Sequence, residues 1–94
     1  MKMILGLCED RHQLPSEVEG YIYPKTVDPL NTILLSSCYI KLAHCSELHL
    51  YVTGLTVALI TVLNYCASNK IPVTLYHFDN NSKNYFTQEV YNNF

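Results

Sequence analysis

The sequence is short of charge, of basic clusters and of long apolar runs, and each shortage excludes a class of protein. Only 15% of its 94 residues are charged and 49% are hydrophobic, which excludes a disordered, highly charged tail. The formal net charge is −2 and lysine and arginine nowhere cluster, so duplex nucleic acid is not an expected partner, because its phosphates require a dense basic surface. No apolar run reaches the roughly 18 residues of a membrane span. The opening apolar run is also shorter than a secretory signal requires.

These shortages leave one globular domain over residues 1–94, which we expect to be cytoplasmic. Motifs of the common metal and catalytic sites are missing as well. The sequence has no Walker loop, no Ser-His-Asp arrangement and no paired metal carboxylates. Its four cysteines never form Cys-x-x-Cys and fall inside apolar runs, where cysteine usually acts as a small buried hydrophobic residue; they are Cys8, Cys38, Cys45 and Cys66. Any chemistry is therefore expected to proceed without a metal or other cofactor.

What is present is an alternation of strand-like and helix-like segments. Residues 3–8 are apolar on both faces, as in a parallel strand covered on both sides, and residues 48–52 and 71–78 are also predicted to be strands. Helices are predicted from a proline-led start at 28–29 to about residue 45, and over 56–70. Residues 79–84 form a turn pattern, and 85–90 are predicted to return as an antiparallel edge strand. Between the first strand and the first helix lies a long loop, in which "YIY" could form a short extended piece.

The two predicted helices carry apolar stripes at helical spacing. In the first, the stripe includes Cys38 and Leu42, together with Leu30, Ile33 and Leu34. In the second it is formed by Val57, Ile60, Leu63, Cys66 and Ala67, and Asn69-Lys70 suits a helix end. Strand, helix, strand, helix, strand predicts an α/β fold, a small open Rossmann-like sheet of about three parallel strands with an antiparallel edge hairpin and helices on the faces.

The turn Thr53-Gly54-Leu55-Thr56 follows the middle strand, at the sheet edge where ligands bind in such folds. Gly54 allows a tight turn, Thr56 can cap the next helix, and the first N–H groups of that helix point outward at its positive dipole end. The turn is thus a candidate anion site. A glycine here can also serve only to turn the chain, and a single glycine is weaker than a full G-x-G-x-x-G motif.

Two other strand ends are expected at the same edge. After the strand at 3–8, Arg11 could pair with a phosphate and His12 could transfer a proton. At the end of the strand at 71–78, His77 could also transfer a proton, and Tyr76 or Phe78 could stack on a base. The candidate ligand-binding residues are Glu9, Asp10, Arg11, His12, Thr53, Gly54, Leu55, Thr56, Tyr76, His77 and Asp79, and the candidate catalytic residues are His77 and His12.

Plainer interpretations of these residues stay open. Residues 9–11 could be a solvated loop with its own salt bridges, and His77 could be a half-buried strand histidine. His44 and His49 are expected near the opposite edge of the sheet, with structural roles.

The second half of the chain, "LYVTGLTVALITVLNYCASNKIPVTLYHFD" followed by "YFTQEV", resembles the small Rossmann-like proteins that accompany type III CRISPR systems, minimal relatives of the CRISPR-associated Rossmann-fold (CARF) sensor domains. The first half matches them in layout. The resemblance implies a homodimer that binds a cyclic oligoadenylate second messenger across its two-fold axis. It also implies that the ligand is sequestered, or cleaved slowly without a metal, as in a ring nuclease.

A homodimer is expected on composition too, because so small and weakly charged a domain leaves apolar surface exposed. The alternative function comes from a different class, a phage-type inhibitor that blocks a host complex through its apolar surface and binds no small molecule. An exposed aromatic patch at Tyr21, Tyr23 and Tyr91 would favour it.

Overall fold

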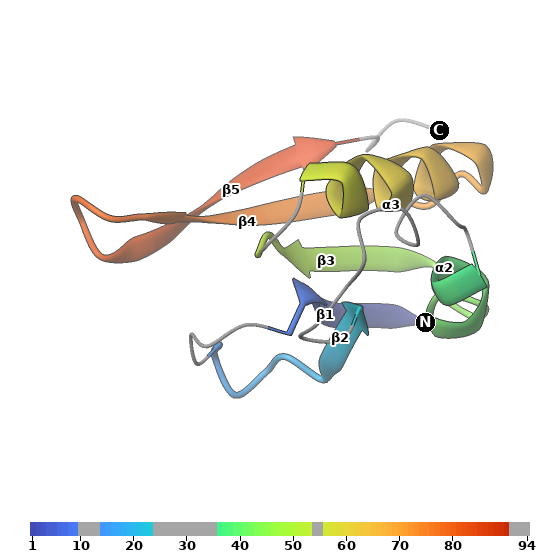
Figure 1. The fold of residues 1–94 in the computed structure, drawn as a ribbon, viewed down its shortest axis with the longest axis horizontal. Helices are drawn as coiled ribbons and strands as arrows, with labels where there is room; N and C mark the ends of the chain where they lie inside the picture. Colours follow the sequence, from blue (N-terminus) through green and yellow to red (C-terminus); the bar gives the residue numbers. More distant parts are fainter. Residues whose placement is uncertain (10–13, 24–35, 54–55, 91–94) are drawn as a thin grey trace.

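A single sheet of five strands forms the body of the fold. The computed structural model describes residues 1–9, 14–23, 36–53 and 56–90. In chain order the elements are β1 (Lys2–Cys8), β2 (Gly20–Tyr23), α2 (Ser36–Lys41), β3 (Glu47–Tyr51), α3 (Thr56–Ser68), β4 (Val73–Asp79) and β5 (Asn84–Val90). The strand order is β2-β1-β3-β4-β5 (Figure 1). The predicted α/β class is confirmed, whereas the predicted helix start at 28–29 lies outside the described residues.

Four neighbouring strands are parallel, one more than predicted. β1, β3 and β4 are joined in parallel with Leu5, Leu50 and Leu75 side by side, and β5 runs antiparallel to β4, as the sequence predicts. The additional strand is β2, formed by the "YIY" piece, which pairs in parallel with β1. It contains only four residues, and a strand this short carries too little alternation to be predicted from its own sequence.

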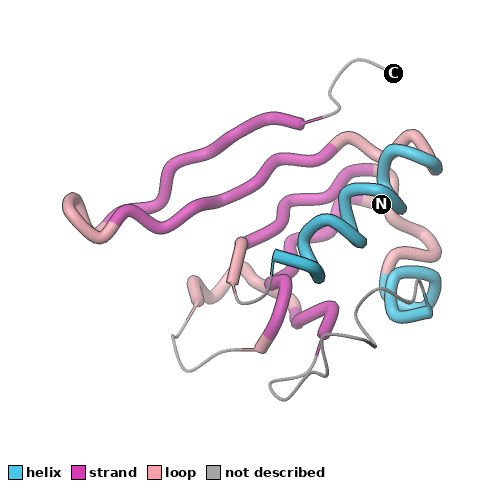
Figure 2. Tube along the Cα trace, turned by 45° about the horizontal axis from the view of Figure 1, so that its top comes forward, coloured by secondary structure: helices cyan, strands magenta, loops and turns pink. Residues whose placement is uncertain are grey.

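Both described helices pack on the same face of the sheet (Figures 1 and 2). One cluster of buried side chains joins Cys38 and Leu42 at α2, and Ala58, Val62 and Cys66 on α3, to the strand residues Leu5, Leu7, Leu48, Leu50, Val73 and Leu75. In the described part of the chain no helix covers the opposite face, although the sequence predicts helices on both. We call this opposite surface the open face.

α3 turns mostly a different side to the sheet from the one that its apolar stripe predicts, and Cys66 is the one residue of that stripe that is buried. Val57 and Ile60 are 40% and 50% exposed. The buried positions are instead Ala58, Thr61, Val62, Tyr65 and Cys66. Because nine of the 13 positions of this helix are apolar, periodicity alone does not identify the buried side. The small Ala58 lets the helix approach the sheet closely, and this packing decides the orientation.

The end of α3 agrees with the sequence. Lys70 has a left-handed backbone conformation with φ of 54°. Its N–H donates to the Ala67 carbonyl at 3.3 Å, and the N–H of Ile71 donates to the Cys66 carbonyl at 2.9 Å. These two bonds form a Schellman motif, which satisfies the last carbonyls of the helix. Ile71 then enters the core at 5% exposure and leads the chain into β4.

Tyrosines, rather than helices, cover much of the open face. The Tyr51 ring is 3% exposed, stacks on Tyr76 with 4.5 Å between ring centroids, and meets the edge of Tyr85 at 4.9 Å. Its hydroxyl donates to Glu17 Oε1 at 2.9 Å. Burial, and after it this hydrogen bond, raises the pKa of Tyr51. A tyrosine ring can bury its apolar body while its hydroxyl reaches a polar partner, so it can finish a sheet face without a further layer of secondary structure.

The β4–β5 hairpin projects beyond the other strands (Figure 1). Its turn is held by Asp79, whose carboxylate accepts hydrogen bonds from the Asn81 N–H at 3.1 Å and the Ser82 hydroxyl at 2.9 Å. Lys83 completes the turn with φ of 60°. The hydrogen bonds from Ser82 and Asn81 lower the pKa of Asp79.

We expect Asp79→Asn to reduce the acid dependence of stability. Because the pKa of Asp79 is lower in the folded chain than its ordinary value of 3.8, its contribution is complete above that value and is lost as the pH falls through the folded pKa. Urea unfolding of the variant and the wild type, measured from neutral pH to pH 3, should show a smaller loss of stability for the variant. The effect will be small because the group is exposed. Identical pH profiles would contradict the role of Asp79 in the turn.

Candidate functional site

The strand order changes direction between β1 and β3. The chain leaves β1 toward β2 on one side, and it leaves β3 through α3 toward β4 on the other. In open α/β sheets, ligands bind outside the carboxyl ends of the strands at such a switch point. Glu9 follows β1 and Thr53 follows β3, so two of the predicted site residues lie at this position.

Thr53 ties the two strand ends together. Its Oγ1 donates to the Cys8 carbonyl at 2.6 Å and accepts from the Cys8 N–H at 3.1 Å. The last backbone pair of β1 and β3 is Gly6 with Tyr51, and two residues further along each strand the Thr53 side chain takes the place of the backbone ladder. Since the hydroxyl already has these partners, its role here is to fix the shape of the edge. Thr56, the first residue of α3, lies exposed on the far side of the turn.

The third predicted strand end, on β4, distributes its side chains over different surfaces. His77 stacks on Phe86 with 5.2 Å between centroids, and its Nε2 lies 3.0 Å from Gln88 Oε1. The ring of Tyr76 lies on the open face, and Asp79 belongs to the hairpin turn. The structure thus brings Glu9 and Thr53 to the same edge, whereas Tyr76 and Asp79 have structural roles elsewhere. Asp10, Arg11, His12, Gly54 and Leu55 lie outside the described residues.

A hydrogen-bonded chain of three side chains lies on the open face. Glu47 Oε2 is 2.5 Å from His49 Nε2, and His49 Nδ1 is 3.0 Å from the hydroxyl of Tyr76. The bond to His49 lowers the pKa of Glu47. Sequence reasoning did not single out Glu47, although Glu-x-His on one strand places both side chains on the same face. His49 lies within β3, whereas His44 is exposed in the loop before it.

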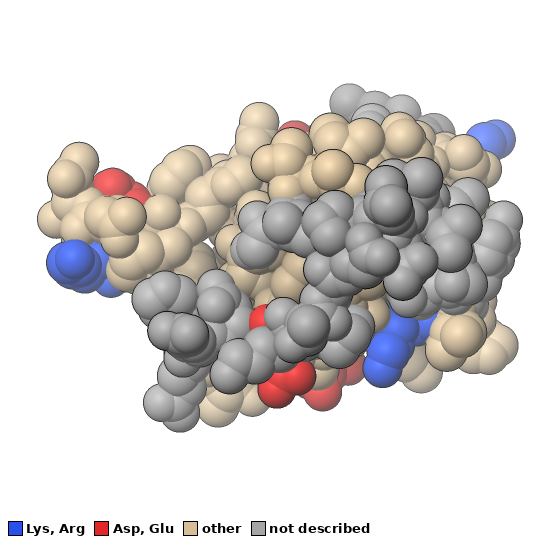
Figure 3. All heavy atoms as spheres, viewed as in Figure 1, with Lys and Arg blue, Asp and Glu red and all other residues tan. Residues whose placement is uncertain are grey.

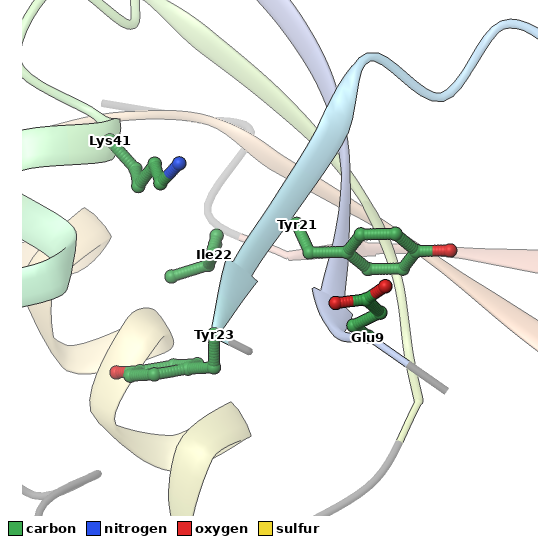
Figure 4. Close-up of a pocket in the computed structure, with 5 residues that line it drawn as sticks. All are labelled: Glu9, Tyr21, Ile22, Tyr23 and Lys41. Atoms are coloured by element: carbon green, nitrogen blue, oxygen red, sulfur yellow. The ribbon is translucent and has the colours of Figure 1, made fainter. Parts of the chain in front are cut away.

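A shallow pocket of about 310 Å³ lies along β2, lined by Glu9, Tyr21, Ile22, Tyr23 and Lys41. Tyr21 and Glu9 extend to one side of the strand, and Ile22 and Tyr23 to the other (Figure 4). Tyr23 is only 3% exposed and its hydroxyl lies 3.8 Å from Cys38 Sγ. Tyr23 therefore does not contribute to the exposed aromatic patch at Tyr21, Tyr23 and Tyr91 that would favour the inhibitor function, and Tyr91 lies outside the described residues. Lys41 is a pocket residue that the sequence did not indicate.

The described lysines do not gather into a patch. In the view of Figure 3 the blue spheres lie at separate places near the rim, and the acidic spheres lie mainly along the lower edge. An anion at the β1–β3 edge would therefore depend on backbone N–H groups and on the dipole of α3 more than on side-chain cations among the described residues.

Three of the four cysteines are buried as the sequence predicts, whereas Cys45 is only half-buried. None of the four forms a disulfide, Cys8, Cys38 and Cys66 are buried, and burial raises the pKa of Cys66 to about 12. A thiol with so high a pKa is not a thiolate nucleophile near neutral pH.

The described residues also lack two features that would point to other functions. They contain no group of three or more His, Cys, Asp and Glu side chains placed to hold a metal ion. Among them, too, no helix has the length and apolar character needed to cross a membrane. Comparison of the chain with models of protein families, with curated proteins and with solved structures finds no match.

Proposed function

We propose that this chain binds a cyclic oligoadenylate at the carboxyl edge of its parallel strands and sequesters it or cleaves it slowly, thereby modulating type III CRISPR antiviral signalling. The observation that carries the proposal is the strand order, since the reversal between β1 and β3 coincides with the turn into α3. The description of the sheet as Rossmann-like belongs to the same proposal, as does the resemblance of the second half of the chain to CARF-related accessory proteins.

The site combines a rigid frame with donors for an anion. Thr53 holds the ends of β1 and β3 at a fixed separation, and α3 begins immediately beyond the turn. The N–H groups of its first turn have no partner within the helix, and they lie at the positive end of the helix dipole. A ligand with several phosphates and several adenine rings matches this arrangement better than a simple anion. β4 is the strand next to β3, and its His77 stacks on Phe86 of β5, so aromatic rings lie on the neighbouring hairpin.

Isothermal titration against cyclic tri-, tetra- and hexa-adenylate, with cyclic di-adenylate and linear oligoadenylate as controls, tests the binding. We expect heat of binding with at least one cyclic oligoadenylate and a weaker response to the linear form. Gly54→Val should abolish binding, because a β-branched side chain would resist the tight turn that the sequence predicts at Gly54 and would crowd an anion bound there. Gly20→Val is the matched control, since a Cβ at Gly20 meets nothing within 4 Å. No heat with any cyclic ligand would reject the proposal.

Cleavage is tested separately from binding. In metal-free cleavage the ribose 2′-oxygen attacks the adjacent phosphorus and the 5′-oxygen leaves with a proton, so the protein must align these atoms and support proton transfer. His77 is the described candidate for that transfer, and Gln88 fixes its ring. Labelled ligand in molar excess, incubated with chelator and then chromatographed, should yield linear product slowly or remain intact. Rapid cleavage that the chelator stops would contradict a metal-free site.

One observation favours the alternative, a protein-interaction inhibitor. Val57 and Ile60 lie one helical turn apart on the outer side of α3, and Ile40 on α2 is 76% exposed. If the titrations give no heat, the inhibitor hypothesis predicts that the protein still suppresses type III interference in cells and that Ile60→Asp removes this effect. Suppression by the Ile60→Asp variant equal to that of wild type would reject it.

A further inference from the structure

We propose that two copies of this chain pair through the outer edge of β5 and form one continuous sheet with a two-fold axis at Thr87. β5 is the last strand of the sheet, and within the described residues no strand pairs with its outer side. An unpaired edge strand is a template for another strand unless the protein protects it. The proposal therefore depends on whether this edge is protected and whether it suits its own copy.

Most of the usual protections are missing from β5, whose one charged side chain is Glu89. Edge strands are commonly protected by lysine, by proline, by a bulge or by being very short. The strand "NYFTQEV" contains no lysine or proline and is seven residues long. Its pairing with β4 is continuous from Val73–Val90 to Asp79–Asn84, which leaves no place for a bulge.

The register shows which residues turn their backbone groups outward. The Tyr76 carbonyl of β4 accepts from Val52 at 3.0 Å, so the backbone groups of Tyr76 face β3. Because successive residues of a strand face alternate sides, those of His77 face β5 and bond to its partner Phe86. The same alternation along β5 directs the N–H and C=O groups of Tyr85, Thr87 and Glu89 toward the outer edge.

One self-pairing register uses the whole strand. With Thr87 opposite Thr87 of the second copy, Tyr85 lies opposite Glu89 and Asn84 opposite Val90. Each of the three outward residues then exchanges two backbone hydrogen bonds with its partner, about six in all. Threonine opposite threonine is a favourable cross-strand pair. The single charge of the strand faces a tyrosine, and the two Glu89 side chains stand about four residues, roughly 14 Å, apart.

Side chains beside the edge also favour a second copy. Phe86 is 54% exposed on the helix side of β5, and in this register it lies beside Gln88 of the other chain. Pairing covers part of this aromatic surface without opposing like charges. Since an edge contact buries less surface than a standard interface, we expect dissociation in the micromolar range.

The pairing has a consequence for ligand binding. This consequence rests on the proposed function, whereas the pairing itself is independent of it. Antiparallel β5 strands make the two β3 strands run in opposite directions, so the two carboxyl edges lie at opposite ends of the joint sheet. About five strand spacings, roughly 24 Å, separate the two β3 strands. Each chain would then bind its own ligand, one per chain, instead of sharing one ligand across the axis.

Sedimentation over a range of concentrations tests the dimer. The wild type should reach twice the chain mass of 10.8 kDa at high concentration. Thr87→Pro removes an outward N–H, and Thr87→Lys places two ammonium groups across the axis, so both should remain monomeric with a folded circular dichroism spectrum. Thr87→Val keeps the backbone groups and should dimerise as the wild type does. The proposal would be overturned by a wild type that stays monomeric, or by one that associates into ever larger oligomers as its concentration rises. It would also be overturned if both Thr87→Pro and Thr87→Lys dimerise as the wild type does.

Cross-linking provides a second test that does not require a destabilised variant. Residues paired by hydrogen bonds in antiparallel strands have Cα atoms about 5.5 Å apart, within disulfide range. Under mild oxidation Thr87→Cys should therefore form a covalent dimer. Glu89→Cys places its thiol on the same face of the sheet but far from the same thiol in the second chain. This variant and the wild type should both form much less covalent dimer. Equal yields from Thr87→Cys and Glu89→Cys would exclude the register, even if the ligand titrations succeed.

Discussion

A Thr53→Val substitution is expected to lower the free energy of unfolding by about 2–3 kcal/mol, because it removes the hydroxyl that hydrogen-bonds to both the N–H and the C=O of Cys8. Valine has almost the shape of threonine, so packing changes little and the loss reports the two hydrogen bonds. Cys8 is 6% exposed, which limits the access of replacement water. Urea unfolding at a fixed protein concentration measures the effect, and the fixed concentration keeps any contribution of association constant.

Thr53→Ser is the matched control for this substitution. It retains the hydroxyl and should recover most of the lost stability. Hydrogen exchange at the Cys8 amide provides a local readout, since protection should fall in the valine variant and remain in the serine variant. Equal stability of the valine variant and wild type would show that Thr53 does not hold the ends of β1 and β3 together, and the rigid frame of the proposed site would be lost with it.

The second large effect is expected at Gly6, where side chains of the open face lie directly against the backbone. A Cβ at this position would lie 2.6 and 2.7 Å from ring carbons of Tyr21 and 2.9 Å from Leu14 Cδ1. We expect Gly6→Ala to cost about 1–3 kcal/mol, because the tyrosine ring must move away from the sheet. Gly20→Ala is the control glycine substitution, since a Cβ there meets open space, and its effect should stay within about 0.5 kcal/mol.

A double-mutant cycle identifies the cause. Combined with Tyr21→Ala, the Gly6→Ala change should cost less than it does alone, with a coupling free energy of about 0.5 kcal/mol or more. The four proteins of the cycle can be compared by urea unfolding under one set of conditions. Additive effects would mean that the ring of Tyr21 does not lie over Gly6, and that the tyrosine cover of the open face is not what stabilises this part of the sheet.

The candidate site was predictable in part, and the limits follow from geometry. That the ends of β1 and β3 meet at one edge follows from their being parallel neighbours, so Glu9 and Thr53 could be expected near each other. The hydrogen bonds of Thr53 to Cys8 could not, because they depend on a register between residues 45 positions apart. The chain from Glu47 through His49 to Tyr76 depends on register in the same way, since Tyr76 reaches His49 only across the β3–β4 pair.

The sequence by itself determined the elements whose signals are local. Apolar runs of strand length gave β1, β3 and β4, and the polar turn at 79–84 gave the hairpin. The Asn69-Lys70 ending of α3 was equally local, because a left-handed residue at a helix end depends only on its own dihedrals and two nearby bonds.

Only the tertiary structure decided where these elements turn their side chains. α3 is apolar nearly all round, so the sheet selected Ala58 and Val62 for burial and left Ile60 outside. β2 became a fourth parallel strand because β1 offered it an edge. Tyr51 and Tyr76 cover the open face because neighbouring strands place their rings 4.5 Å apart. Burial of apolar area has no direction of its own, and the orientation of each element is therefore set by the neighbours that the whole fold brings to it.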